Sequence, residues 1–186
     1  GKRNLQGLDK PILDSLGIDK NKPEKQQRNQ TGSPILEEGD ILLNTTLAET
    51  NDWQQVDLPV VRTLRHFCIE TLSSYTEDNQ ACISEVDLLD DKGQPIDKTK
   101  WEVVYVSSEQ ADKNLGVAEN LFDGDISSFW HTDPATEPGQ PHRIIVDIKE
   151  IYKISALRFK VRKGAFLSGK VKEINVYGRP QFFLFH

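Results

Sequence analysis

The chain has 186 residues, of which 37% are hydrophobic and 28% are charged, a composition normal for a globular protein with some flexible sequence. This length is sufficient for one domain with a hydrophobic core and a tail. The formal net charge of −6 argues against nucleic acid as a partner, and no apolar run approaches the ~20 residues that a membrane-spanning helix needs.

Residues 1–33 are rich in Lys, Asn, Gln, Asp and Gly. The stretch Asn21-Lys-Pro-Glu-Lys-Gln-Gln-Arg-Asn-Gln-Thr-Gly-Ser-Pro34 contains none of the large hydrophobic residues. A segment of this composition cannot bury enough apolar surface to offset the entropy that is lost on folding. We therefore predict a flexible arm or linker over residues 1–33 and a single folded domain over residues 34–186.

From residue 35 onward, alternating or apolar stretches are separated by Gly, Pro and Asp, a pattern that predicts strands. At most a turn of helix is expected, over residues 109–118. Strands at such short spacing favour an all-β antiparallel sandwich or jelly roll over a fold of alternating strands and helices. The predicted strands cover residues 40–44, 53–59, 63–72, 80–89, 101–106, 142–148, 154–162 and 170–177.

The strand pattern also predicts which side chains are buried. Phe67 and Ile69 alternate with His66 and Glu70, so we expect His66 on an exposed strand face. The four apolar residues 182–185, Phe-Phe-Leu-Phe, are contiguous near the end of the chain. We expect them to form a final buried strand.

The two cysteines are Cys68 and Cys82. If residues 63–72 and 80–89 form a hairpin, the two sulfur atoms lie near each other across it, and a disulfide could form. Two buried free thiols are the alternative, because an isolated cysteine packs like a small hydrophobic residue. Neither cysteine has a Cys-x-x-Cys partner or a nearby histidine in the sequence that would indicate catalysis.

The stretch Asn120-Leu-Phe-Asp-Gly-Asp-Ile-Ser-Ser-Phe-Trp-His-Thr132 concentrates oxygen ligands on one tight turn. Asp123, Asp125 and Ser128 offer the hard oxygen atoms that calcium prefers. Gly124 can adopt the positive φ that such a turn often needs. An ordinary Asp-Gly turn between two strands is the competing interpretation.

Three stretches together resemble the discoidin or coagulation factor V/VIII C-type (F5/8 type C) domain. They are Ala118-Glu-Asn-Leu-Phe-Asp-Gly-Asp-Ile-Ser-Ser-Phe-Trp-His-Thr132, Pro141-His-Arg-Ile-Ile-Val-Asp-Ile148 and Ile154-Ser-Ala-Leu-Arg-Phe159. The most similar branch is carbohydrate-binding module family 32, which binds sugars. The resemblance implies a galactose-binding-domain-like β-sandwich jelly roll with a structural calcium ion and no catalytic residues.

The order of the segments differs from the order that is usual in this family. A Trp strand, an Arg-aromatic strand and an Ala-x-x-x-Glu strand usually come last, but here only residues 178–186 follow the strand at 170–177. Similar segments lie upstream: Asp52-Trp53, Arg65-His-Phe-Cys-Ile-Glu70 and Ala81-Cys-Ile-Ser-Glu-Val-Asp-Leu88. We therefore predict one domain with circularly permuted strand order. Two truncated domains with separate cores are the alternative.

The resemblance implies a metal site and a sugar site. Around calcium it places Asp123, Asp125 and Ser128, together with Glu85 as the distant acidic ligand. In the sugar site it implies His131 and Arg162 as donors to ring hydroxyls, with Phe166 as a stacking face. Ser168 stands where the family usually has Asn.

These expectations lead to a non-catalytic module that binds a glycan of the galactose or N-acetylhexosamine type. We expect it outside the cytoplasm (extracellular, periplasmic or at the cell surface), within a larger multidomain or surface assembly. An adhesion or protein-interaction domain that has lost sugar binding is the alternative. A hydrolase is the third hypothesis, but no paired carboxylates occur in a recognisable catalytic setting.

Overall fold

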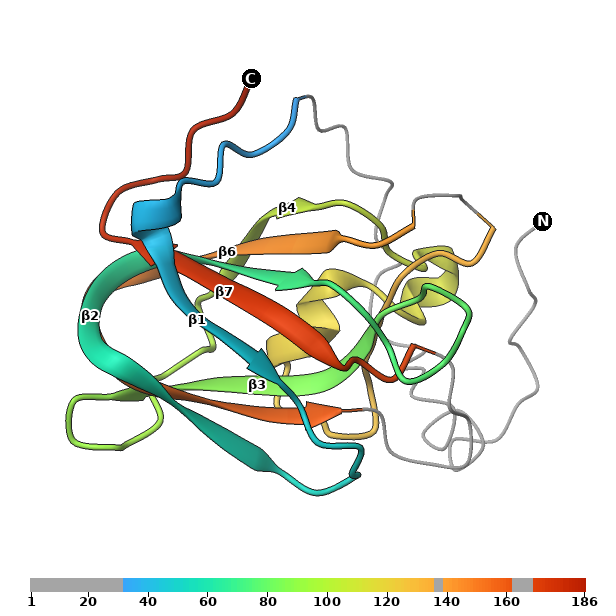
Figure 1. Ribbon diagram of the computed structural model, residues 1–186, viewed down its shortest axis with the longest axis horizontal. Coiled ribbons are helices and arrows are strands. Elements are labelled where there is room, and N and C mark those ends of the chain that lie inside the picture. The colour runs from blue at the N-terminus through green and yellow to red at the C-terminus, as the bar shows by residue number, and fades with distance from the viewer. Residues whose placement is uncertain (1–31, 136–138, 162–168) are drawn as a thin grey trace.

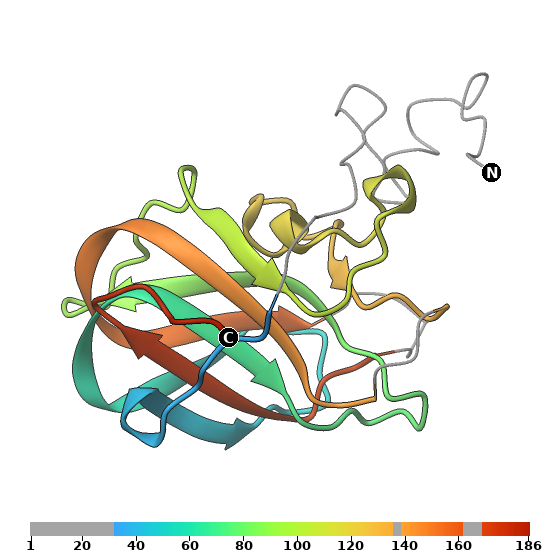
Figure 2. The same cartoon turned by 90° about the horizontal axis from the view of Figure 1, so that it is seen from above.

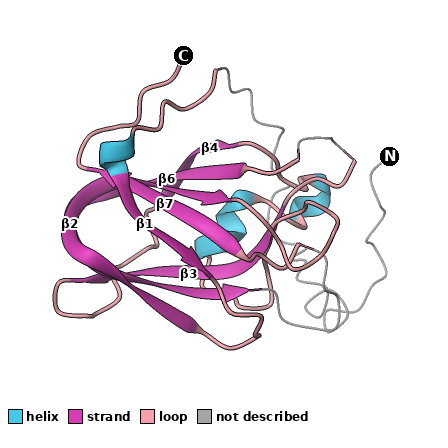
Figure 3. Cartoon of the chain, viewed as in Figure 1, coloured by secondary structure: helices cyan, strands magenta, loops and turns pink. Residues whose placement is uncertain are grey.

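The computed structural model describes residues 32–135, 139–161 and 169–186, and this part of the chain is built mainly of antiparallel strands (Figure 1, Figure 3). The prediction of an all-β fold is confirmed. Only three short 3₁₀ helices occur among the described residues: η1 Glu38–Asp40, η2 Asp112–Asn114 and η3 Ala118–Phe122. The strands are β1 Ile41–Thr46, β2 Gln54–Thr71, β3 Cys82–Asp90, β4 Glu102–Val106, β5 Trp130–His131, β6 His142–Val161 and β7 Glu173–Arg179.

Two long strands, β2 and β6, pair with each other along their length and connect the two layers of the sandwich. The pairing of β2 shifts register between Asp57 and Arg62 and again between Leu64 and His66. On one side of these shifts β2 also pairs with β7 and β6 with β4, whereas on the other side β6 pairs with β3. Figure 2 shows both ribbons curving from one layer into the other. One layer has the order β1-β7-β2-β6-β4, and the other has the order β2-β6-β3-β5.

The hydrophobic core draws on residues from both halves of the chain. Its largest fully buried side chains are Trp130, Phe67 and Phe159. Leu42, from β1, belongs to the same buried cluster as Val176, from β7. The segments before residue 98 and after it therefore share a core, as a permuted strand order requires. The alternative of two separate cores does not describe this structure.

A second, smaller cluster covers the outer face of the layer that contains β7. It is formed by Cys68, Ile145, Tyr177 and Phe183. The two ends of the described chain meet beside it, where the N–H of Ser33 donates to the carbonyl oxygen of His186 at 2.9 Å. Figure 1 shows these two end segments side by side. The predicted arm over residues 1–33 lies, except for its last two residues, outside the described chain.

Residues 63–72 and 80–89 do not form the hairpin that a disulfide between the two cysteines would require. Strand β6 lies between β2 and β3 and hydrogen-bonds to both of them. Cys68 is therefore opposite Ile145, and Cys82 is opposite His131. Both cysteines are buried free thiols, so this is the correct one of the two alternatives. Burial is the main reason that the pKa of Cys68 is raised far above its ordinary range.

Two predictions of burial are also wrong. His66 is only 1% exposed, because the C-terminal segment covers it and the ring of Phe182 stacks on it at 4.3 Å. Within residues 182–185 only Phe183 is buried, whereas Phe182 and Leu184 are 53% and 60% exposed. This segment runs along the surface of the sheet, so its side chains alternate between the sheet and the outside. None of the helices that the structure describes has the length and apolar character to cross a membrane.

Candidate functional site

Residues 123–128, here called the acidic turn, follow the short helix η3. Side chains of the turn hydrogen-bond to other residues of the same turn. The N–H of Asp125 donates to Asp123 Oδ1 at 2.9 Å, and the hydroxyl of Ser128 donates to Asp123 Oδ2 at 2.5 Å. Gly124 has a φ of 79°, which a residue with a side chain rarely adopts. The positive φ predicted for this glycine is confirmed.

Glu85 reaches the acidic turn from β3, which packs against η3. Its carboxylate is 1% exposed and accepts the N–H of Gly124 at 3.2 Å to each oxygen. Burial raises the pKa of Glu85 to about 7, and the nearby charge of Asp123 acts in the same direction, whereas Lys98 opposes the shift. The structure therefore brings Glu85 to the turn to which the resemblance assigned it.

The donor set at this turn has the chemistry that calcium prefers. The turn offers three hard oxygen ligands: the carboxylate of Asp123, the carbonyl oxygen of Asp125 and the hydroxyl of Ser128. The carboxylate of Glu85, from β3, is the fourth. The carboxylate of Asp125 itself accepts the N–H of Ser127 at 2.9 Å and its hydroxyl at 2.6 Å. Within the described residues, no three His, Cys, Asp or Glu side chains gather as a metal cluster. Calcium at this turn stays a prediction.

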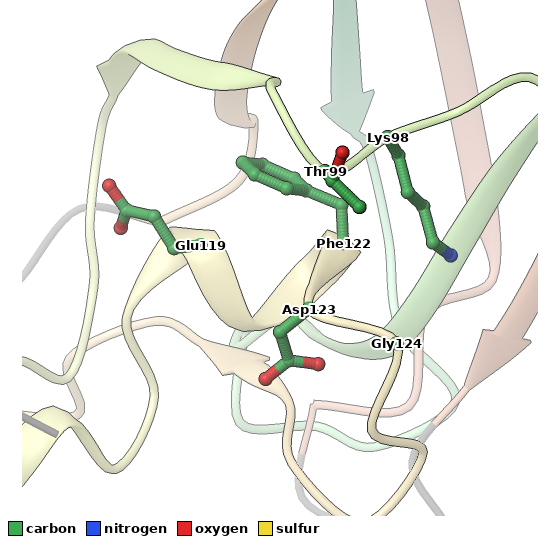
Figure 4. Close-up of a pocket in the computed structure, with 6 residues that line it drawn as sticks. All are labelled: Lys98, Thr99, Glu119, Phe122, Asp123 and Gly124. Atoms are coloured by element: carbon green, nitrogen blue, oxygen red, sulfur yellow. The ribbon is translucent and has the colours of Figure 1, made fainter. Parts of the chain in front are cut away.

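A pocket of about 380 Å³ opens beside the acidic turn. Figure 4 shows Glu119 and Lys98 at its two sides in this view, with the ring of Phe122 between them. Asp123 and Gly124 line it below Phe122 in this view and connect it to the turn, and Thr99 lines it above Phe122. Lys98 was not among the predicted site residues. The turn signal at residues 90–95 could have indicated that the chain returns along β3 and brings this lysine back to Glu85.

His131 is the one predicted sugar-site residue that the described chain contains. It lies at the end of β5 and is only 5% exposed. Its Nδ1 atom is 2.5 Å from the carbonyl oxygen of Thr132, so Nδ1 carries the proton. Its main chain is held by Gly116 and Gln110, through hydrogen bonds of 3.0 and 2.8 Å. Arg162, Phe166 and Ser168 lie outside the described residues, and their roles stay predictions.

A polar network beside His131 ties two loops together and was not predicted. The hydroxyl of Thr132 donates to Gln80 Oε1 at 2.6 Å and accepts the N–H of Ala81 at 3.0 Å. Gln140 continues the network, because its Nε2 donates to the carbonyl oxygen of Gln80 at 3.4 Å. Its Oε1 accepts the hydroxyl of Thr71 at 2.9 Å. The Trp-His-Thr motif contains Thr132 and could have indicated it, but the partners come from loops whose contacts no local pattern shows.

Comparison with known proteins shows similarity to a known family over the second half of the chain. The model of the F5/8 type C domain matches residues 103–181, which contain β5 to β7 and all of β4 except its first residue. A sialidase from Micromonospora viridifaciens is 33% identical over 84 residues, which is 44% of this chain and 13% of the sialidase. The chain thus spans only a small part of that relative. The resemblance read from the sequence is confirmed over the matched residues.

Proposed function

Because residues 103–181 belong to the F5/8 type C domain family, we propose that the protein is a non-catalytic module that binds carbohydrate. Domains of this family are typically binding modules without catalysis of their own. The observation that carries the proposal is the matched segment itself, which includes the Trp-His-Thr motif and holds His131 at the end of β5. The hydrogen bonds of His131 to Gly116 and Gln110 fix its main chain.

The proposed ligand is a glycan of the galactose or N-acetylhexosamine type. The similarity to a sialidase supports a glycan-related role, but the match covers 13% of that protein, so we transfer no hydrolytic activity. A histidine and an arginine donate hydrogen bonds to sugar hydroxyls, and an aromatic face packs against the apolar side of a sugar ring. His131, Arg162 and Phe166 are the residues proposed for these roles, and Ser168 lies in the same stretch.

A module of this kind acts where glycans are exposed. We therefore propose an extracellular, periplasmic or cell-surface location, within a larger protein or assembly. The calcium ion is a separate part of the proposal. Glu85, Asp123, Asp125 and Ser128 would hold it, where it would supply positive charge that ties the acidic turn to β3.

A glycan array probed with the full chain tests the proposal. We expect saturable binding to galactose- or N-acetylhexosamine-type glycans by the native protein. The variants His131→Ala and Arg162→Ala should lose this binding while they keep a cooperative thermal transition. His186→Ala, at the exposed terminal residue, is the matched control and should bind like the native protein.

An adhesion or protein-interaction domain is the second candidate function. Three exposed aromatic or aliphatic side chains near the C-terminus, Phe182, Leu184 and Phe185, favour it, because such residues can contact a partner. The array distinguishes the two candidates. A folded protein that binds no glycan would favour protein interaction and would reject the carbohydrate-binding proposal.

A further inference from the structure

A lysine reaches the acidic turn from the segment that joins β3 to β4. After β3 the chain reverses, with the N–H of Gly93 donating to the carbonyl oxygen of Asp90 at 3.0 Å. It then runs back beside the strand, where the N–H of Ile96 donates to the carbonyl oxygen of Leu88 at 3.0 Å. This reversal brings Lys98 next to the part of β3 that contains Glu85.

The ammonium group of Lys98 is fully engaged by β3. It forms an ion pair with Glu85 Oε2, and a second with Asp87 Oδ1 at 2.5 Å. It also donates to the carbonyl oxygen of Val86 at 3.2 Å. An ammonium group has three N–H donors, and these three acceptors use all of them. The side chain of Lys98 is only 17% exposed, so these pairs are largely shielded from water.

From this geometry we infer that Lys98 is an internal cation that competes with calcium for the carboxylate of Glu85. The inference rests on the calcium part of the proposed function. It has two consequences. The fold does not require calcium, because the buried charge of Glu85 already has a cationic partner. Calcium binding is weak, because the ion must displace the ammonium group or share Glu85 with it.

The physical basis is the cost of a buried carboxylate and the repulsion between two cations. A buried carboxylate without a partner strongly destabilises the folded state, so Lys98 offsets a large penalty at Glu85. A calcium ion bound by Glu85, Asp123 and Ser128 would lie close to the ammonium group. Two positive charges at such short distance repel each other strongly away from bulk water. Replacement of the lysine by a neutral side chain should remove this competition.

The test compares Lys98→Met with the native protein. Thermal unfolding is measured in chelator and in excess calcium, and calcium binding is measured by titration calorimetry. We expect the native protein to unfold at nearly the same temperature in both conditions. Lys98→Met should unfold at a lower temperature in chelator, should recover with calcium and should bind calcium at least about tenfold more tightly.

Two further variants serve as controls. Lys100→Met removes a positive charge from an exposed lysine in the same loop and should behave like the native protein. Lys98→Arg keeps the charge and should also bind calcium weakly. If Lys98→Met does not fold in chelator, refolding on addition of calcium would support the inference, and failure to refold would contradict it.

The inference is overturned if Lys98→Met and the native protein bind calcium equally, or if neither binds it. A native protein that loses a large part of its thermal stability in chelator would also overturn it. Each of these results leaves glycan binding, which is measured separately, unaffected. Failure of this inference can therefore be distinguished from failure of the carbohydrate-binding proposal.

Discussion

Gly116 lies directly against the main chain of His131, at the end of the sandwich where the proposed sugar site lies. A Cβ atom added there would lie 2.9 Å from the Cβ of His131 and 3.0 Å from that of Gln110. Contacts this short force neighbouring atoms to move, so the site has room only for glycine. The small residue thus determines where the histidine sits.

We expect Gly116→Ala to lower both the stability and the glycan affinity of the protein. The added methyl group overpacks the site, at a cost of about 1–3 kcal/mol in the free energy of unfolding. The matched control is Gly39→Ala, because a Cβ atom at Gly39 would meet nothing within 4 Å. Chemical denaturation and glycan titration of both variants check this expectation. Equal stability of the two variants would show that the contact is not restrictive.

The buried histidine of β6 gives a prediction about pH. His142 is 0% exposed, and its Nε2 lies 2.7 Å from the carbonyl oxygen of Asn79. Burial lowers the pKa of His142 below its ordinary value of 6.5, although this hydrogen bond opposes the shift. Below pH 6.5 the unfolded chain therefore takes up a proton more readily than the folded protein. Stability should fall as the pH falls from this value toward the folded pKa.

His142→Gln should reduce this loss, because glutamine keeps a donor for the carbonyl oxygen of Asn79 but does not titrate. The free energy of unfolding, measured between about pH 5 and pH 8, tests this. His66 should retain part of the slope, since burial also lowers its pKa. The exposed His186 provides the control variant, His186→Gln. An unchanged slope in His142→Gln would contradict the prediction.

At the scale of the elements, the C-terminal segment, residues 182–186, covers the small hydrophobic cluster on the outer face of the sheet. Phe183 is 3% exposed and packs in the cluster with Cys68, Ile145 and Tyr177. Its N–H also donates to His66 Nδ1 at 3.2 Å. The neighbouring Leu184 points outward and is 60% exposed. Adjacent residues of one segment therefore differ sharply in their contribution to stability.

Phe183→Ala should destabilise the protein by about 3–5 kcal/mol, as expected for removal of a buried aromatic ring. It should also make the thiol of Cys68 react faster with a thiol reagent, because the ring covers that face. Leu184→Ala is the control and should change stability by no more than about 0.5 kcal/mol. Urea unfolding and thiol labelling measure both effects. Similar losses in the two variants would contradict the alternation seen in this segment.

The alternation of apolar residues could predict most strands, but not their partners or their continuity. Residues 53–59 and 63–72 were predicted as two strands, and they form the single bent strand β2. Residues 142–148 and 154–162 likewise lie almost wholly in β6. A bend that exposes a few residues interrupts the local pattern, although the strand continues and its pairing with β6 resumes at Arg62. A hairpin between β2 and β3 could not be excluded from the sequence, because the strand that separates them, β6, comes later in the chain.

The candidate site could be predicted in part. The acidic turn, its glycine and the approach of Glu85 follow from the motif and the family resemblance. Lys98 could not be predicted in this way, because its position depends on how the chain reverses after β3. The bonds of Thr132 to Gln80 and Ala81 also join loops that are distant in the sequence.

At the scale of the whole molecule, the matched segment depends on strands that precede it. Strand β6 lies between β2 and β3 in one layer, and both of these neighbours come from residues before the matched segment. The same core cluster contains Leu64 and Leu88 together with Leu157 and Val176. A fragment that lacks β2 and β3 would expose the strand edges of β6 and part of the core.

We therefore expect the fragment of residues 98–186 to lack a cooperative unfolding transition. Mixing it with the fragment of residues 1–97 should restore β-structure and a cooperative transition, because the two pieces then complete one core. Circular dichroism during thermal unfolding measures this, with the uncut chain as the control. A fragment 98–186 that unfolds cooperatively alone would contradict the shared core.

The central claim is that the protein binds carbohydrate through the loops around His131. It is tested most directly by calorimetric titration of the full chain with lactose and with N-acetylgalactosamine. We predict saturable binding of at least one of these sugars by the native protein, and its loss in His131→Ala and Arg162→Ala with the fold retained. Absence of binding by the folded native protein, or unchanged binding in both variants, would contradict the claim.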